Sequence, residues 1–209
     1  MSKTILITGA STGFGRDTAE TLARAGHHVF ASMRDPEGKN RPHSDALRKQ
    51  GSGLVITIGS ILGRVTFPFF GIYGASKFAV EALTDSLRYE VSQLGIEVAL
   101  VQPSAYPTPM YSNVQQPADT ARAASYGAVG EIPGAMFKHF ISTFEAANAP
   151  NPHDVAEAIA RLVDQPKGSR PARTVVGTAF GSDTVNQQTA PVQAHVVEAL
   201  GLGHLAKVA

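Results

Sequence analysis

The sequence predicts an α/β protein built on a doubly wound parallel sheet. Short apolar segments of strand length alternate with longer segments whose apolar residues recur at helical spacing. A glycine-rich turn joins the first strand to the first helix, as is typical of parallel α/β sheets. The chain has 209 residues, of which 43% are hydrophobic. That length and composition suit one domain over residues 1–209, and no repeat or linker divides it.

The first half of the chain contains three predicted strands, at residues 4–8, 28–32 and 54–58. Between the first two, residues 16–25 have the apolar spacing of a helix, which the following glycine would close. Prolines and glycines after the second strand predict a loop. Residues 44–50 then predict a short helix before the third strand.

The second half begins with a long predicted helix over residues 73–94, which a glycine ends. A strand follows at residues 96–102. Several prolines then make the sequence irregular until Asn151, whose side chain would cap a helix that runs to about Val163. The last predicted elements are a short strand and an amphipathic helix, at residues 174–176 and 191–200.

Composition excludes several classes of function. The chain has 18 lysines and arginines against 17 acidic residues, a formal net charge of +1, and no cysteine. The basic residues are scattered, so nucleic acid is not an expected partner. The seven histidines show no metal-ligand spacing, so no metal site is expected. The apolar stretch at residues 5–7 is too short for a signal peptide or a membrane span. We therefore expect a soluble cytoplasmic protein.

The glycine-rich turn is a candidate dinucleotide site. Glycines let backbone amides approach a phosphate, and the helix N-terminus adds a partial positive charge. Two other interpretations are a tight turn without a ligand and the nucleophile elbow of α/β-hydrolases, whose Gly-x-Ser-x-Gly pattern residues 9–13 also fit. An elbow normally follows several strands, whereas this turn follows the first. The residues of the predicted Rossmann-like phosphate site are Gly9, Ser11, Gly13, Phe14 and Gly15.

Tyr73 and Lys77 are four residues apart, so on a helix they share a face. A free phenol has a pKa near 10, and a neighbouring ammonium group favours the phenolate. Tyr73 can therefore exchange a proton with an alcohol or carbonyl oxygen, which Ser60 can also hydrogen-bond. Taken alone, such a pair is more often a solvent-exposed helix face, and such a serine a turn residue. Glu81 and Asp85 on the same helix are interpreted as a polar face rather than as paired catalytic carboxylates.

Together these motifs resemble the short-chain dehydrogenase/reductase family over nearly the whole chain. The family carries a similar glycine turn, a serine like Ser60 and a Tyr-x-x-x-Lys pair like Tyr73 and Lys77. Residues 103–108 are similar to its Pro-Gly-x-x-x-Thr segment, with serine in place of the glycine. The resemblance implies that Tyr73 is the general acid/base and that Ser60 orients the substrate. It also implies that Lys77 lowers the pKa of Tyr73 and binds the nicotinamide ribose, and that the segment from Pro103 to Thr108 holds the carboxamide.

The end of the second predicted strand bears on the choice of cofactor. An acidic residue there binds the ribose of NAD, whereas a basic residue accommodates the 2′-phosphate of NADP. Arg34 occupies this region and favours NADP(H), although a solvent-exposed loop arginine is the other interpretation.

The resemblance also implies a shortened sheet. The third and fourth strands of the family, with its Asn-Ala-Gly turn and catalytic asparagine, have no counterpart between residues 33 and 53. Removing them from the family order 3-2-1-4-5-6-7 leaves, after renumbering, the flavodoxin-like order 2-1-3-4-5. The linking segment is long enough for a right-handed crossover.

We interpret the chain as an oxidoreductase that transfers a hydride between NADP(H) and a carbonyl or alcohol group of a small, apolar substrate. Residues of about 106–150 form the expected substrate or lid region. One alternative is a cofactor-independent esterase or lactonase in which Ser60 is the nucleophile and Tyr73 with Lys77 the base. Another is a non-catalytic protein for nucleotide binding or scaffolding. Homo-oligomer formation is left open.

Overall fold

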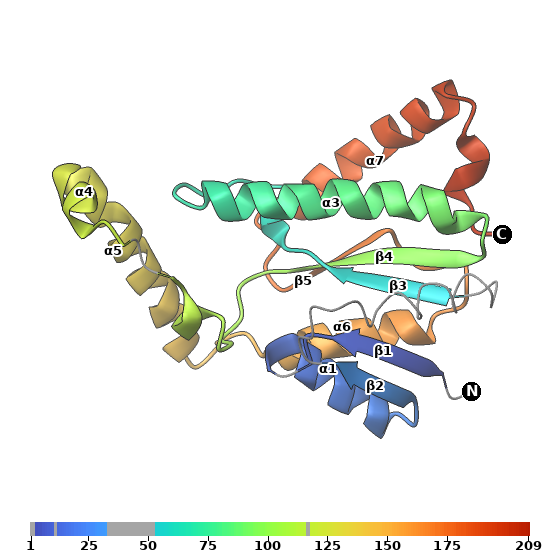
Figure 1. The fold of residues 1–209 in the computed structure, drawn as a ribbon, viewed down its shortest axis with the longest axis horizontal. Helices are drawn as coiled ribbons and strands as arrows, with labels where there is room; N and C mark the ends of the chain where they lie inside the picture. Colours follow the sequence, from blue (N-terminus) through green and yellow to red (C-terminus); the bar gives the residue numbers. More distant parts are fainter. Residues whose placement is uncertain (1–2, 11, 33–52, 116–117) are drawn as a thin grey trace.

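The computed structural model describes residues 3–10, 12–32, 53–115 and 118–209. Helices cover both faces of parallel strands, and an arm made of two helices stands away from the strands (Figure 1). The strands are β1 (Thr4–Thr8), β2 (His28–Ser32), β3 (Gly53–Ile58), β4 (Ile96–Pro103) and β5 (Arg173–Val176). The α-helices are α1 (Gly13–Arg24), α3 (Gly71–Ser92), α4 (Thr120–Ser125), α5 (Ala128–Ser142), α6 (His153–Asp164) and α7 (Ser182–Ala199). Short 3-10 helices are η1 (Ile61–Gly63), η2 (Tyr111–Asn113), η3 (Thr143–Glu145) and η4 (Gly203–Ala206).

The strands form two parallel sheets rather than one. β1 pairs with β2, starting with Thr4 opposite His28. The second sheet has the order β3-β4-β5. Both groupings agree with the predicted order 2-1-3-4-5, but among the described residues no ladder joins β1 to β3. The prediction of one continuous sheet is therefore wrong at this junction, where side-chain packing rather than backbone pairing connects the two halves.

That packing is centred on α6. Val155, Ile159 and Leu162 of this helix are buried together with Val101 of β4 and Val176 of β5. Partly buried residues from both sheets pack against the same cluster, namely Ile5, Ile7, Val29, Leu54 and Ile56. α1 and α6 lie on one face of the strands, whereas α3 lies on the other face beside β3 and β4 (Figure 1). The two sheets thus share one apolar core.

Several predicted helix ends are confirmed. α3 ends at Ser92 and Gly95 follows with a φ of +73°, in the left-handed region that glycine tolerates. The Asn151 side chain accepts a hydrogen bond of 3.0 Å from the backbone nitrogen of His153, at the start of α6. The helix predicted at residues 44–50 lies outside the described residues.

Two helical regions differ from the prediction. Residues 128–142 form α5 with Pro133 inside it, although the prolines predicted irregular structure. Ring contacts from Phe137 and Phe140 to Tyr111 stabilise this helix against the lost backbone hydrogen bond. α7 begins well before Pro191, the residue at which a helix start was predicted. Arg64 donates hydrogen bonds to side chains of its first half and so stabilises the earlier start.

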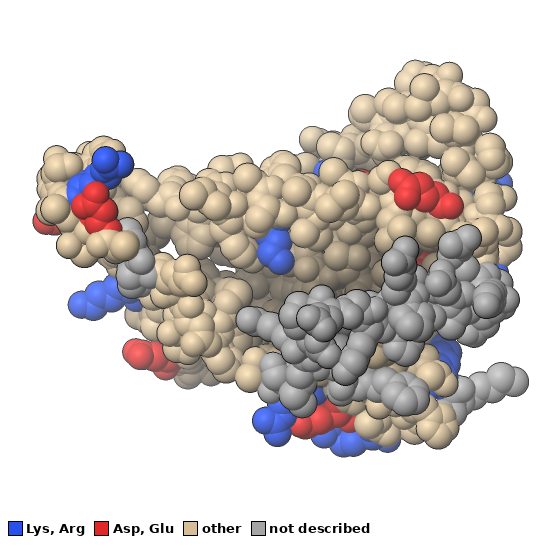
Figure 2. Space-filling view, in the orientation of Figure 1, with Lys and Arg blue, Asp and Glu red and all other residues tan. Residues whose placement is uncertain are grey.

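The surface has few charges over much of the side seen in Figure 2. Uncharged side chains dominate over α3 and α5, while charged side chains gather at the tip of the arm near α4. Within the described ranges, no helix combines the length and apolarity required to cross a membrane.

Gly15→Ala is expected to destabilise the protein by about 1–3 kcal/mol, because an added Cβ would lie 2.3 Å from the carbonyl oxygen of Gly9. The matched control is Gly134→Ala in α5, where an added Cβ meets nothing within 4 Å. This control should leave stability unchanged or raise it by roughly 0.5–1 kcal/mol. Urea unfolding measures the free energy of unfolding of both variants. Equal stabilities would show that α1 does not approach the backbone of Gly9 closely.

Candidate active site

The turn between β1 and α1 has the backbone geometry of an anion site. Gly9 and Gly13 have φ values of +71° and +57°, and a Cβ added at either would meet nothing within 4 Å. Gly15 instead lets α1 approach the backbone of Gly9. Thr12 precedes α1 but makes no side-chain capping hydrogen bond, so it leaves the first amides of the helix without that partner. The turn therefore offers backbone donors and open space to a phosphate.

The side chain of Phe14 packs inside the protein and does not face an open phosphate site. Its ring packs edge-to-face on Tyr106, with centroids 5.8 Å apart. Tyr106 is fully buried and donates a hydrogen bond of 3.4 Å to Asp154 Oδ2. Burial first, and Asp154 second, raise the pKa of Tyr106 to about 12. Ser11 and Arg34, the other predicted phosphate contacts, lie outside the described residues.

The structure brings Ser60, Tyr73 and Lys77 together beyond the carboxyl end of β3. Ser60 is buried, and its Oγ accepts a hydrogen bond of 3.2 Å from the backbone nitrogen of Leu62. The Ser60 hydroxyl lies near enough to the Tyr73 phenol to lower its pKa. Lys77 Nζ lies 5.7 Å from the centroid of the Tyr73 ring and donates to the carbonyl oxygen of Ile58 at 3.5 Å. A phenol, a hydroxyl and an ammonium group thus share one small site.

The electrostatics of Tyr73 differ from the expectation that Lys77 favours its phenolate. Burial raises the pKa of Tyr73, and the nearby Ser60 hydroxyl opposes this shift only in part. Burial also lowers the pKa of the Lys77 ammonium group. Desolvation prevails because the charged form of each group loses water. In the protein alone, Tyr73 is therefore protonated at neutral pH and can donate a proton.

Pro103 and Thr108 lie at the carboxyl end of β4, the strand next to β3. Pro103 is buried and pairs with Val176 of β5. The half-buried Thr108 lies in the loop that leaves this strand, and its carbonyl oxygen accepts a hydrogen bond of 3.2 Å from Tyr111. Ligands of open α/β sheets bind at this edge.

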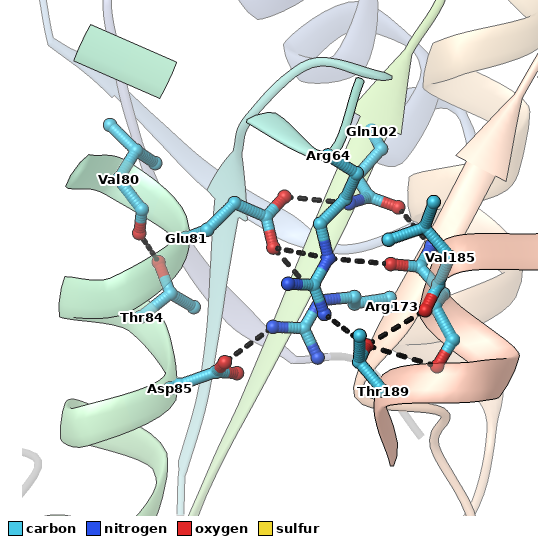
Figure 3. A network of polar contacts seen from close by, with 10 residues as sticks. Arg64, Val80, Glu81, Thr84, Asp85, Gln102, Arg173, Val185 and Thr189 are labelled. Atoms are coloured by element: carbon cyan, nitrogen blue, oxygen red, sulfur yellow. Dashed lines mark hydrogen bonds and ion pairs between the residues drawn. The ribbon is translucent and has the colours of Figure 1, made fainter. Parts of the chain in front are cut away.

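A buried polar network fixes the helix that carries Tyr73 and Lys77 (Figure 3). Glu81 of α3 is only 3% exposed, so the polar face predicted for this helix is buried at this position. One of its carboxylate oxygens accepts from Gln102 Nε2 at 2.6 Å and the other from Arg173 Nε at 2.8 Å. Arg64 Nε lies 3.7 Å from the second oxygen. The network ties α3 to β4, β5 and the segment after η1.

The network continues from Gln102 to α7. Gln102 Oε1 accepts from Asn186 Nδ2 at 2.7 Å, and Asn186 Oδ1 accepts from Arg64 Nε at 2.8 Å. Arg173 also pairs with Asp85. The spacing of four residues places Glu81 on the same side of the helix as Lys77, but it does not identify the partners of Glu81, which are distant in sequence.

Comparison with known proteins gives a consistent result. A family model described as short chain dehydrogenase matches residues 3–44 and 39–119. The 3-ketodihydrosphingosine reductase of Bacteroides thetaiotaomicron is 27% identical over 241 residues, covering 83% of this chain and 87% of the relative. The uncharacterized oxidoreductase YbbO of Escherichia coli is 25% identical over 189 residues, covering 56% of this chain and 70% of the relative.

Solved structures with a similar fold include a short-chain dehydrogenase from Streptomyces avermitilis. It has a TM-score of 0.65 and 21% identity, with 97% of this chain and 99% of that chain covered. A short chain dehydrogenase/reductase from Burkholderia phymatum, in complex with NAD, has a TM-score of 0.61 and 16% identity at 92% and 95% coverage. A short chain dehydrogenase from Burkholderia cenocepacia, in complex with NADP, has a TM-score of 0.61 and 16% identity at 95% and 97% coverage. These likenesses show the fold.

Glu81→Ala is expected to lower the free energy of unfolding by about 3–5 kcal/mol, because it leaves the partly buried Arg64 and Arg173 without their shared carboxylate. The control is Glu90→Ala, an exposed carboxylate at the end of the same helix, which should change stability by at most roughly 0.5 kcal/mol. Urea unfolding compares the two variants. Similar losses in both would contradict the role of Glu81 in positioning α3.

Proposed function

Because this chain belongs to the short-chain dehydrogenase family, whose members are oxidoreductases, we propose that it transfers a hydride between NADP(H) and the carbonyl or alcohol group of an apolar substrate. The observation that carries this proposal is the placement of Ser60, Tyr73 and Lys77 at one site, with Lys77 Nζ 5.7 Å from the centroid of the Tyr73 ring. Its position at the carboxyl edge of parallel strands, the usual ligand edge of such sheets, supports it further.

The residues at this edge fit a nicotinamide dinucleotide. The uncapped amides of α1 and the open turn at Gly9 and Gly13 suit its pyrophosphate. In our proposal Lys77 holds the nicotinamide ribose, and the segment from Pro103 to Thr108 holds the carboxamide. When bound, the nicotinamide supplies or accepts the hydride.

The preference for NADP over NAD rests on Arg34, whose guanidinium group would pair with the 2′-phosphate. Structures of similar fold contain NAD or NADP, so the fold alone does not select between them. Ser11 would add a hydroxyl donor to the phosphates in the same turn.

The proton is handled by Tyr73 in this proposal. In the direction of reduction, its hydroxyl donates a proton to the carbonyl oxygen as that oxygen gains negative charge. The Ser60 hydroxyl hydrogen-bonds the same oxygen and orients it. Lys77 stabilises the phenolate that forms, since its ammonium group lies near the Tyr73 ring.

An apolar substrate fits the surroundings of the site. Met110 and Val114, in the region after β4, are exposed large hydrophobic residues, as are Val129 and Ile132 of α5. The side of the molecule seen in Figure 2 has few charges over α3 and α5. One relative is named as a 3-ketodihydrosphingosine reductase, and this name specifies a ketone substrate for that protein. We place the substrate region in residues of about 106–150.

The position of the Ser60 hydroxyl beside Tyr73 also suits a hydrolase with Ser60 as nucleophile. Cleavage of an activated ester without nucleotide, lost in Ser60→Ala, would favour that second candidate. Nucleotide binding without turnover would favour a non-catalytic role.

Calorimetric titration with NADPH and NADH is the first test of the proposal. Micromolar binding of NADPH is expected, and Arg34→Glu should weaken it by about 10-fold or more because a charge-assisted contact becomes repulsive. Arg122→Glu, an exposed arginine of α4, is the matched control and should bind like the parent protein. Failure of both nucleotides to bind would overturn the oxidoreductase proposal for this chain.

The pH dependence of carbonyl reduction tests the role of Tyr73. The reduction needs a protonated Tyr73, and burial raises its pKa above the ordinary value. The rate should therefore stay flat from about pH 6 to about pH 9 and fall only above that range. Tyr73→Phe should lower kcat by about 100-fold or more while NADPH affinity remains. A rate that falls through neutral pH, or an active Tyr73→Phe variant, would contradict this assignment.

A further inference from the structure

Tyr106 lies where the two halves of the proposed nucleotide site meet. It belongs to the segment from Pro103 to Thr108, which leaves β4 at its carboxyl end. It is only 1% exposed, and its ring packs edge-to-face on Phe14 with centroids 5.8 Å apart. Phe14 is in the first turn of α1, directly after Gly13 of the glycine turn. One side chain thus joins the proposed carboxamide segment to the helix that begins at the glycine turn.

The hydroxyl of Tyr106 restrains the ring from two further sides. It donates a hydrogen bond of 3.4 Å to Asp154 Oδ2, in the first turn of α6. It also faces Gly177, the residue that follows β5, because a Cβ added there would lie 2.8 Å from the hydroxyl oxygen. The position of Tyr106 is therefore fixed by contacts with α1, α6 and the end of β5, as a residue that positions a site requires.

The start of α6 also contacts α1 directly. His153, next to Asp154, lies with its Nδ1 3.0 Å from both carboxylate oxygens of Asp17 in α1. Phe14 and Asp17 are three residues apart, so they share one face of α1. α1 and α6 lie beside each other in Figure 1. The contacts form a closed circuit from α1 through Tyr106 to α6 and back, and we refer to these five residues as the junction.

The separation of the two half-sites depends on side chains such as these. The glycine turn follows β1, whereas Tyr106 follows β4 of the other sheet, and among the described residues no ladder joins β1 to β3. A ligand that spans two linked half-sites gains affinity from both only when their separation matches its own length. A residue that fixes this separation therefore controls the affinity for the whole ligand.

We propose that Tyr106 is a positioning residue that sets the separation between the glycine turn and the carboxamide segment, so that a nicotinamide dinucleotide binds at both only while the junction is intact. This inference rests on the proposed function and concerns nucleotide affinity rather than the transfer of hydride or proton. The backbone of the glycine turn does not depend on the Tyr106 hydroxyl. A nucleotide fragment that binds only at this turn should therefore bind independently of the junction.

Calorimetry with two ligands tests the proposal. NADPH spans both half-sites, whereas ADP-ribose 2′-phosphate corresponds to the same nucleotide without its nicotinamide ring. Tyr106→Phe keeps the ring contact with Phe14 and loses the bond to Asp154, so it should weaken NADPH binding about 3-fold. Tyr106→Leu also removes the ring contact and should weaken NADPH binding about 10-fold or more. Both variants should bind the fragment with the affinity of the parent protein.

Tyr89→Phe in α3 is the control, because the half-buried Tyr89 hydroxyl has no hydrogen bond to the described part of the chain. This variant should bind both ligands like the parent protein. Unchanged NADPH affinity in the Tyr106 variants overturns the proposal. Equal losses for NADPH and the fragment also overturn it, since they indicate that Tyr106 supports the fold in general and not the separation of the half-sites.

Two further outcomes are decisive. If Tyr106→Leu does not fold, Tyr106→Phe decides alone, because it removes a single oxygen atom and keeps the core filled. A parent protein that binds neither ligand, or only the fragment, overturns the proposed function and this inference with it. The parent protein is titrated in the same series, so that result is distinguished from a failure of the inference alone.

Discussion

Packing of α6 against side chains of both sheets is the interaction on which the rest of the structure depends. β1 leads into the glycine turn, and β3 leads into Ser60, so each sheet carries half of the candidate site. In the described part of the chain no backbone ladder joins these two strands. The distance between the glycine turn and Tyr73 is therefore set by apolar contacts, with Ile159 and Leu162 at their centre. Such contacts are strong but less directional than ladder hydrogen bonds.

The polar network around Glu81 fixes the orientation of α3, which apolar packing alone does not specify. A buried carboxylate shared by two arginines stabilises little in net terms, because both kinds of charge lose their hydration. It does restrict the angle and height of α3, since each partner comes from a different element. Tyr73 and Lys77 lie near the start of this helix, so the network acts on the proposed proton donor from one to two turns away. The geometry of the candidate site therefore depends on both the apolar core and the polar network.

Local signals in the sequence predicted most strands and helices, including the glycine after α3 and the Asn151 cap. They also predicted that Ser60, Tyr73 and Lys77 come together. Three features depended on non-local contacts and could not be predicted. Pro133 predicted irregular structure at residues 128–142, but ring packing stabilises α5 there. Glu81 meets arginines distant in sequence. The direction of the pKa shift of Tyr73 depends on burial, which spacing along a helix does not specify.

The split between the sheets has a consequence for how the protein behaves in solution. β1 and β3 each have one edge without a strand partner among the described residues, and Leu6 and Ile58 on these strands are 36% and 37% exposed. Edge strands that carry apolar side chains are a template for strand addition. Solubility and homogeneity of this protein should therefore depend on its concentration and on the chaperones and peptides present while it folds.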